Sequence, residues 1–313
     1  MRVVFLGTPM FAVPAFRMLL EHSYEICGVF TQPDRPAGRG QRLQPGPIKV
    51  LAQERGIPVF QPVRIRNEEN RPILENLRPD FVVVAAYGQI LPGWLLKAAR
   101  IAPVNIHGSL LPRYRGAAPV AWAIINGETK TGVTTMIIHE ELDSGPILLQ
   151  QEVPIPIDQT AGELASELSV IGAKLLIKTL EDLQKGTVDP IIQDTTQICW
   201  APRITKEMGR ISWQKRALDI HNQIRGMNPW PIANAEFRGA HLRIWRSAPA
   251  SASDDFKSVP GTFLGLAKNG IYVQCGEGTA LEILEVQMPA KEKVTGREFA
   301  NGARLHPGEL FFH

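Results

Sequence analysis

The feature that most constrains the fold is a series of short apolar runs without polar alternation. The clearest is Phe-Val-Val-Val-Ala-Ala at 81–86. Runs of this kind suit strands that are buried on both faces, as in a parallel sheet. Further runs of the same type extend from Val3 to Leu6, Ile26 to Phe30, Ile101 to Ile106 and Val133 to Ile138.

Helical patterns separate several of these runs. Apolar residues recur at helical spacing at 13–22, 49–55 and 163–185. Strands that alternate with helices predict βαβ units with right-handed crossovers. We therefore expect an α/β domain with a mostly parallel sheet over residues 1–188.

The pattern changes in the C-terminal third. Residues 189–208 include Pro190 and Pro202 among scattered polar residues, which predicts a linker. Evenly spaced short strands with turn signals predict a small β-barrel domain over 209–313, and 313 residues suit two domains. The short apolar segments lie at 233–237, 241–245, 261–266, 270–273 and 281–286.

Composition narrows the class of protein. An apolar share of 44% indicates a globular chain, and a net charge of +3 is too small to indicate a nucleic-acid partner by itself. Three cysteines without a CxxC pair argue against a disulfide framework or a structural zinc site. No run approaches the roughly 20 apolar residues of a membrane span. We expect a cytoplasmic protein with no membrane partner.

Asn105 and His107 follow a predicted strand and lead into a loop rich in glycine and proline. Residues two apart in a strand project to the same face. An amide donor beside an imidazole suits acyl transfer, in which one group stabilises an oxyanion and the other moves a proton. On these two residues alone, a turn cap for Asn105 and a satisfied surface histidine for His107 are the favoured interpretation. The glycine- and proline-rich loop that follows shifts the balance toward acyl transfer.

Asp143 follows the predicted strand at 133–138 and is flanked by glycine and proline. Active sites of open α/β sheets gather beyond strand ends, so this carboxylate is expected to meet the imidazole of His107 in one crevice. An ordinary Asp-Ser-Gly turn is the alternative. His139, Glu140 and Glu141 lack the HExxH spacing of a metal site, and we expect no metal.

The turn Gly7-Thr8-Pro9 follows the first predicted strand. A dinucleotide site needs GxGxxG at this point and an acidic residue after the second strand. Thr31-Gln32-Pro33 stands there instead. A tight turn is the better interpretation than NAD binding.

A basic loop extends from Pro33 to Pro47 and carries Arg35, Arg39 and Arg42 among glycines and prolines. Long loops inside compact domains tend to be functional, and arginines are well suited to phosphates. A solvated surface loop is the alternative interpretation.

Together these segments resemble the methionyl-tRNA formyltransferase family. The resemblance runs in family order along nearly the whole chain. It rests on Phe5 to Pro9, Thr31 to Gly40, Ala86 to Pro92, Asn105 to Pro119, Leu142 to Gly145 and Asn228 to Pro231.

The resemblance implies a Rossmann-like formyltransferase domain followed by an OB-like β-barrel that assists tRNA binding. It implies 10-formyltetrahydrofolate as formyl donor, initiator methionyl-tRNA as acceptor, and no obligate protein partner. The implied catalytic residues are Asn105, His107 and Asp143. The implied folate-binding residues are Leu110, Leu111, Pro112, Arg113, Tyr87, Gly88, Gln89, Ile90 and Leu91. The implied tRNA-binding residues are Arg35, Arg39 and Arg42, with Arg39 foremost.

Two residues depart from the family pattern. Met10 stands where an acidic residue is common, and Glu141 stands where a glycine often precedes Leu-Asp. Formyltransferases of purine synthesis, formyl-folate hydrolases and sugar-nucleotide formyltransferases share an Asn, His and Asp arrangement and remain alternatives. A non-catalytic RNA-binding protein is a further one.

Overall fold

The structure is a computed structural model that describes residues 1–37, 42–250 and 258–310. The chain divides into two compact units. The first comprises Met1–Pro119, Thr131–Pro154 and Ala165–Pro202, and the second comprises Val120–Lys130, Ile155–Leu164 and Arg203–His313. Residues 189–202, part of the stretch predicted as a linker, thus pack with the first unit, because Ile191 bridges Ile147 and Trp200 pairs with Arg115.

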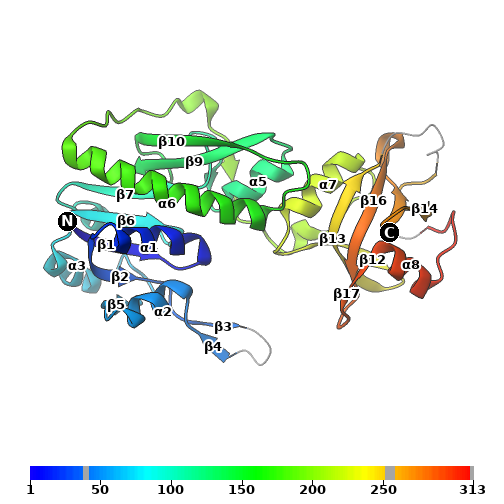
Figure 1. The fold of residues 1–313 in the computed structure, drawn as a ribbon, viewed down its shortest axis with the longest axis horizontal. Coiled ribbons are helices and arrows are strands. Elements are labelled where there is room, and N and C mark those ends of the chain that lie inside the picture. Colours follow the sequence, from blue (N-terminus) through cyan, green and yellow to red (C-terminus); the bar gives the residue numbers. More distant parts are fainter. Residues whose placement is uncertain (38–41, 251–257, 311–313) are drawn as a thin grey trace. The chain divides into compact units, whose positions relative to one another are not determined.

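A seven-stranded sheet forms the centre of the first unit (Figure 1). Five neighbouring strands pair in parallel, in the order β7 (Ala102–His107), β6 (Phe81–Ala85), β1 (Arg2–Gly7), β2 (Glu25–Phe30) and β5 (Val59–Phe60). Strand β9 (Lys130–Ile137) runs antiparallel to β7. The mostly parallel sheet predicted from the sequence is thereby confirmed. Its order is β10 (Ile147–Pro154), β9 (Lys130–Ile137), β7 (Ala102–His107), β6 (Phe81–Ala85), β1 (Arg2–Gly7), β2 (Glu25–Phe30) and β5 (Val59–Phe60).

Helices cover both faces of this sheet, which explains the unbroken apolar runs. On one face Phe5 of β1 packs edge-on against Phe16, with ring centroids 5.3 Å apart. On the other face Val4 and Leu6 join a core cluster with Leu74 and Leu95. The helices of the N-terminal half are α1 (Val13–Glu21), α2 (Pro47–Glu54), α3 (Arg71–Leu77), α4 (Gly93–Leu96), α5 (Pro119–Ile125) and α6 (Ala161–Lys185). Shorter elements are η1 (Met10–Ala12), η2 (Glu68–Asn70), η3 (Thr195–Gln197), β3 (Arg35–Ala37), β4 (Arg42–Gln44), β8 (Arg115–Gly116) and β11 (Trp200–Ala201).

The long helix α6 packs against β7 and β9. A Cβ built on Gly172 would lie 2.8 Å from the Ile106 side chain, so the helix approaches the sheet closely at this glycine. The hydroxyls of Thr135 and Thr179 pair at 2.7 Å between strand and helix. This pairing satisfies two polar groups that the sheet buries.

The second unit contains an antiparallel sheet with helices α7 and α8. Each of the five short apolar segments predicted as strands coincides with one of its strands. The sheet order is β12 (Ala233–Phe237), β13 (Ala240–Pro249), β16 (Ala280–Gln287), β15 (Ile271–Gln274) and β14 (Phe263–Leu266), with β17 (Lys293–Thr295) paired to β16. The helices are η4 (Glu207–Gly209), α7 (Ala217–Gly226), η5 (Gly276–Gly278) and α8 (Gly296–Ala303).

Helix α7 carries buried polar side chains that bind the 155–164 segment of the same unit. His221 bonds the Ile157 carbonyl through Nε2 at 2.8 Å and the Ser247 hydroxyl through Nδ1 at 3.0 Å. Arg225 donates to the Pro156 carbonyl at 3.1 Å. These hydrogen bonds fix the 155–164 segment to helix α7.

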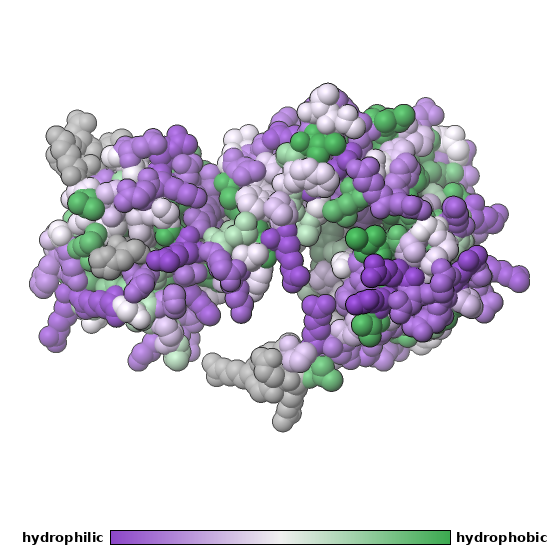
Figure 2. Space-filling view, turned by 180° about the vertical axis from the view of Figure 1, so that it is seen from behind, coloured by the Kyte–Doolittle hydropathy of each residue, from purple (hydrophilic) through white to green (hydrophobic). Residues whose placement is uncertain are grey.

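The surface drawn in Figure 2 is mostly hydrophilic, with hydrophobic residues scattered over it. Within the described part of the chain, we find no helix whose length and hydropathy would let it cross a membrane.

Candidate active site

Strand β7 places Asn105 and His107 on one face of the sheet, as the two-residue spacing predicted. In the register, Asn105 lies between Val84 of β6 and Met136 of β9. His107 lies opposite Thr134. The intervening Ile106 points toward α6, so the two polar residues face away from that helix.

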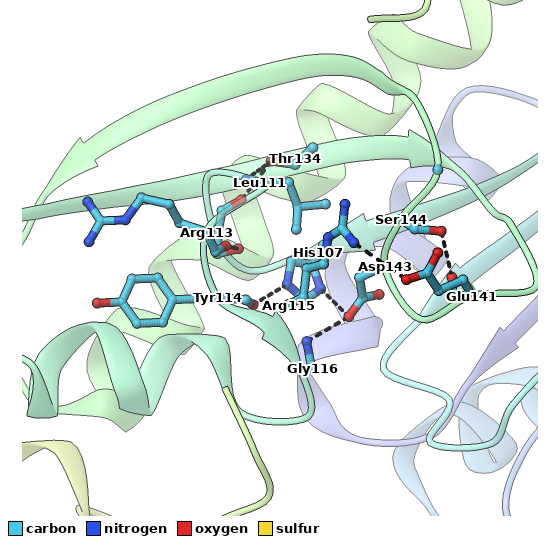
Figure 3. Close-up of polar contacts among 12 residues, drawn as sticks. His107, Leu111, Arg113, Tyr114, Arg115, Gly116, Thr134, Glu141, Asp143 and Ser144 are labelled. Carbon is cyan, nitrogen blue, oxygen red and sulfur yellow. Dashed lines mark hydrogen bonds and ion pairs between the residues drawn. The ribbon is translucent and has the colours of Figure 1, made fainter. Parts of the chain in front are cut away.

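Both ring nitrogens of His107 face oxygen atoms (Figure 3). Nε2 lies 2.9 Å from the Tyr114 carbonyl, and Nδ1 lies 3.7 Å from Oδ2 of Asp143. A carbonyl oxygen only accepts, so Nε2 carries a proton in this hydrogen bond. Nδ1 is therefore the nitrogen at which this buried ring can gain or lose a proton.

Asp143 is held by backbone groups rather than by a cation. Its Oδ2 accepts the amide of Gly116 at 2.8 Å, and its side chain is 10% exposed. Its φ of 49° lies in the left-handed region, where few residues other than glycine, asparagine and aspartate are comfortable. The same oxygen, Oδ2, thus accepts the Gly116 amide and faces Nδ1 of His107.

The predicted meeting of Asp143 and His107 occurs, but the expected route to it was wrong. Both residues were expected at the ends of two strands that open onto the same crevice. Because β9 is antiparallel to β7, its carboxyl end, Ile137, lies opposite Val104 rather than beside His107. The loop that follows β9 carries Asp143 back to the imidazole.

The loop after His107 is fixed through one threonine. Thr134 Oγ1 donates to the Ser109 carbonyl at 2.7 Å and accepts the Leu111 amide at 3.1 Å. Gln150 of β10 adds bonds to the Leu111 carbonyl and to Thr134 Oγ1, both at 2.9 Å. The hairpin of β9 and β10 therefore shapes the loop that supplies the Tyr114 carbonyl.

Arg115 is a buried cation beside the site. It was not among the residues predicted from the sequence. Its side chain is 3% exposed, and Nε and Nη2 donate to Oε1 of Gln193 at 3.0 and 2.8 Å. Gln193 in turn donates to the carbonyls of Asp143 and Gly145. Local sequence holds no signal for Gln193, since its partner Arg115 lies 78 positions earlier.

Strand β11 supports the same loop from its other side. It pairs in parallel with β8, with Trp200 opposite Arg115 and Ala201 opposite Gly116. The Tyr114 amide donates to Cys199 Sγ at 3.1 Å. The stretch from Gln193 to Ala201 thus contributes directly to the order of the site.

Asn105 has a different environment from that of His107. Its side chain is partly exposed, and the part of the chain that the structure describes offers its amide no hydrogen-bond partner. A fixed strand position and a free amide donor suit an oxyanion that forms during a reaction.

The nine residues expected to bind folate lie in two turns. Tyr87 and Leu91 are buried in the core cluster that also contains Val84, the neighbour of Asn105, whereas Ile90 is 77% exposed. Burial raises the pKa of the Tyr87 hydroxyl, which has no hydrogen-bond partner among the described residues. Gly88 is exposed and Gln89 accepts the Ile65 amide at 2.7 Å. In the other turn, Leu111 is buried, Leu110 and Pro112 are partly exposed, and Arg113 is exposed.

A pocket of about 450 Å³ adjoins the Asp143 loop. This volume lies within the range of small-molecule sites. Its lining comes from Gly93, Leu96 and Lys97 on one side and from Ile138 to Glu141 with Ser144 on the other. Glu141 and Ser144, which lie within two positions of Asp143 in sequence, therefore form part of the pocket wall.

The basic loop is a two-stranded hairpin, in which Arg35 pairs with Gln44 and Arg42 with Ala37. Arg39 lies outside the described residues. The base is anchored where Lys49 donates to Asp34 at 2.6 Å. Hydrogen bonds from Gln61 and then Lys49 lower the pKa of Asp34. The hairpin projects from the first unit beside α2 (Figure 1).

Among residues 1–37, 42–250 and 258–310, no three histidine, cysteine, aspartate or glutamate side chains gather as they would to hold a metal ion.

Two family models match the chain. Formyl transferase matches residues 1–180, and formyl transferase, C-terminal domain, matches residues 203–304. The methionyl-tRNA formyltransferase of Trichlorobacter lovleyi is 47% identical over 309 residues, which cover 99% of this chain and 96% of the relative. The enzyme of the same name from Bacillus velezensis is 43% identical over 99% of this chain and 97% of its own.

Solved structures resemble the fold at low sequence identity. An N-formyltransferase from Helicobacter canadensis in complex with folinic acid and dTDP-3-aminofucose matches with a TM-score of 0.67 and 19% identity, covering 91% of this chain and 98% of its own. HypX from Aquifex aeolicus in complex with tetrahydrofolic acid matches with a TM-score of 0.64 and 18% identity, covering 96% and 47%. At such identities the likeness concerns the fold.

Proposed function

The chain belongs to the methionyl-tRNA formyltransferase family, and on that premise we propose how its site works. The protein transfers a formyl group from 10-formyltetrahydrofolate to the free amino group of initiator methionyl-tRNA. Asn105, His107 and Asp143 carry the chemistry. The arrangement of oxygens around the two nitrogens of His107 is the observation that carries this assignment.

The reaction joins the methionyl nitrogen to the formyl carbon. The unprotonated amine attacks, the formyl oxygen becomes an oxyanion, and Asn105 donates a hydrogen bond to that oxygen. The amine then loses a proton, and the folate nitrogen leaves with one. His107 carries this proton through Nδ1, since Nε2 is bound to the Tyr114 carbonyl. Asp143 faces the imidazolium that forms.

The gap between Nδ1 and Asp143 supports this division of roles. At 3.7 Å it exceeds an ordinary N–H···O hydrogen bond, which is about 2.7–3.2 Å. Catalytic hydrogen bonds are often long without substrate and tighten in the reacting complex. A small movement of the Asp143 loop would close the contact once a proton reaches Nδ1.

Folate binding is assigned to the two turns around the site. Leu110, Leu111, Pro112 and Arg113 follow His107 directly, and the turn from Tyr87 to Leu91 follows the neighbouring strand β6. The unpartnered buried hydroxyl of Tyr87 supports a polar ligand at the second turn. Arg35, Arg39 and Arg42 of the basic loop from Pro33 to Pro47 bind the phosphates of the tRNA.

A formylation assay tests the proposal. Purified protein, 10-formyltetrahydrofolate and charged initiator tRNA should give formylmethionyl-tRNA, and uncharged tRNA should give none. A sugar nucleotide with a free amine, offered in parallel, tests the alternative acceptor. Formyl-folate turnover without transfer to tRNA would identify a hydrolase, and tRNA binding without any turnover would identify a binding protein.

A further inference from the structure

Gln193 is buried where its neighbours are exposed. Its relative exposure is 5%, whereas Ile191 and Ile192 are 62% and 86% exposed. A chain that turns isoleucines outward and an amide inward departs from the usual preference for apolar burial. A buried amide also costs free energy unless its polar atoms are paired. The placement of Gln193 therefore needs an explanation in its contacts.

The Gln193 amide joins two loops of the active site. Oε1 accepts from Nε and Nη2 of Arg115 at 3.0 and 2.8 Å. Nε2 donates to the Asp143 carbonyl at 2.8 Å and to the Gly145 carbonyl at 2.7 Å. Both donor hydrogens and both acceptor sites of the amide are used. One side chain thus connects the loop after β7 with the loop after β9.

We propose that Gln193 is a positioning residue, which fixes the Asp143 carboxylate relative to His107. The inference rests on the proposed function, because it gives Asp143 its role. Asp143 occupies a left-handed conformation, with φ at 49°. The two carbonyls bound by Gln193 belong to Asp143 itself and to the residue two positions later. They hold the backbone that directly follows Asp143.

Substitutions can distinguish the acceptor role of the Gln193 amide oxygen from the donor role of its nitrogen. Gln193→Glu keeps an acceptor for Arg115 and strengthens that contact by charge, but it replaces the donor with oxygen facing two carbonyls. Gln193→Leu removes both halves at similar size. Gln197→Glu is the matched control, since Gln197 is exposed in the same segment and bonds only to Asp194 within the described residues.

Steady-state kinetics with the full-length protein give the first readout. A misplacement on the scale of 1 Å can cost about 100-fold in rate. We expect kcat to fall by about that factor in Gln193→Glu and Gln193→Leu, with KM for both substrates close to wild type. Gln193→Glu should also melt at a lower temperature, because its buried carboxylate oxygen faces two carbonyls without a donor. Wild-type kcat in a folded Gln193→Glu protein would overturn the inference.

A double-mutant cycle gives the second readout. A residue that acts through Asp143 should add less than about twofold to the loss already caused by Asp143→Asn, whereas independent effects multiply. Fully multiplied losses would assign Gln193 a structural role only. If wild-type protein does not formylate methionyl-tRNA at all, the proposed function fails. Active wild type with unaffected Gln193 variants removes the inference alone.

Discussion

The backbone amide of Gly116 and the carboxylate of Asp143 meet at 2.8 Å, through the same oxygen that faces His107. The backbone of one loop therefore sets the distance between the acid and the imidazole of the site. A neutral amide donor holds the carboxylate without neutralising its charge. A proton that arrives on Nδ1 of His107 would face this hydrogen-bonded oxygen.

Asp143→Asn removes that charge and keeps the size of the side chain. We expect kcat to fall by about 10²- to 10⁴-fold, the range associated with loss of general acid–base assistance. Folate affinity, measured by fluorescence titration, should change little. Asp194→Asn, at an exposed helix cap in the same unit, is the control. Undiminished turnover in Asp143→Asn would remove the residue from the proton path.

Asn105→Ala tests the oxyanion role. Loss of one such donor typically costs about 10²- to 10³-fold in kcat. Asn105 has no hydrogen-bond partner among the described residues, so the melting temperature should remain near the wild-type value. Asn67→Ala, at an exposed position, controls for a general effect of losing an amide. A loss confined to KM would reassign Asn105 to substrate binding.

Arg39→Ala tests the contribution of the hairpin to tRNA binding. Each phosphate contact adds roughly 0.7–0.9 to the slope of log affinity against log salt. The variant should bind tRNA more weakly and show a slope smaller by about that amount. Arg71→Ala is the control, because Arg71 is exposed and paired with Glu75. Equal slopes for wild type and Arg39→Ala would exclude this contact.

Gly145→Ala tests the packing of the Asp143 loop. A Cβ at this position would lie 1.8 Å from the Ile137 carbonyl oxygen, so the backbone must shift. We expect a loss of about 1–3 kcal/mol or more in the free energy of unfolding, together with reduced kcat. Gly302→Ala has open space in helix α8 and should stabilise by about 0.5–1 kcal/mol. Denaturant unfolding distinguishes the two, and a neutral Gly145→Ala would contradict the described backbone.

His221 gives the second unit a pH dependence. Burial lowers the pKa of His221 from its ordinary value of 6.5, aided by the charge of Arg225. Its contribution to stability is therefore complete above pH 6.5 and is lost as the pH falls through the lowered pKa. The difference in melting temperature between wild type and His221→Gln should be largest above pH 6.5 and shrink in acid. A wild-type advantage that grows in acid would reverse the assigned direction.

The parallel part of the sheet was predictable because its signal is local. Val3 to Leu6 alternate between two helical layers, so every position is apolar. The common face of Asn105 and His107 follows from the two-residue period of a strand. The five predicted strands of the second unit likewise carry their own turn signals.

The rest depends on partners distant in sequence. The segment at 147–154 was not predicted as a strand, because its middle is polar and exposed. The reversed direction of β9 has no local signal, since it follows from how that hairpin adds to the sheet. In sequence Gln193 cannot be distinguished from other polar residues of the predicted linker. Its role depends on Arg115, which only the fold brings beside it. The proposal that Asn105, His107 and Asp143 are catalytic thus depended on family resemblance.

The segment that contains Gln193, Cys199 and Ala201 is synthesised after the residues that it supports, so the site is completed late in translation. A ribosome completes Asn105, His107 and Asp143 first, and Gln193 emerges 50 positions after Asp143. Domains fold largely as units during synthesis, beginning from the N-terminus. A nascent chain that has just finished α6 already holds the three residues proposed as catalytic, yet it lacks β11 and the Gln193 amide, which brace the two loops. We expect such a chain to be inactive, and activity to begin only after β11 has left the ribosome.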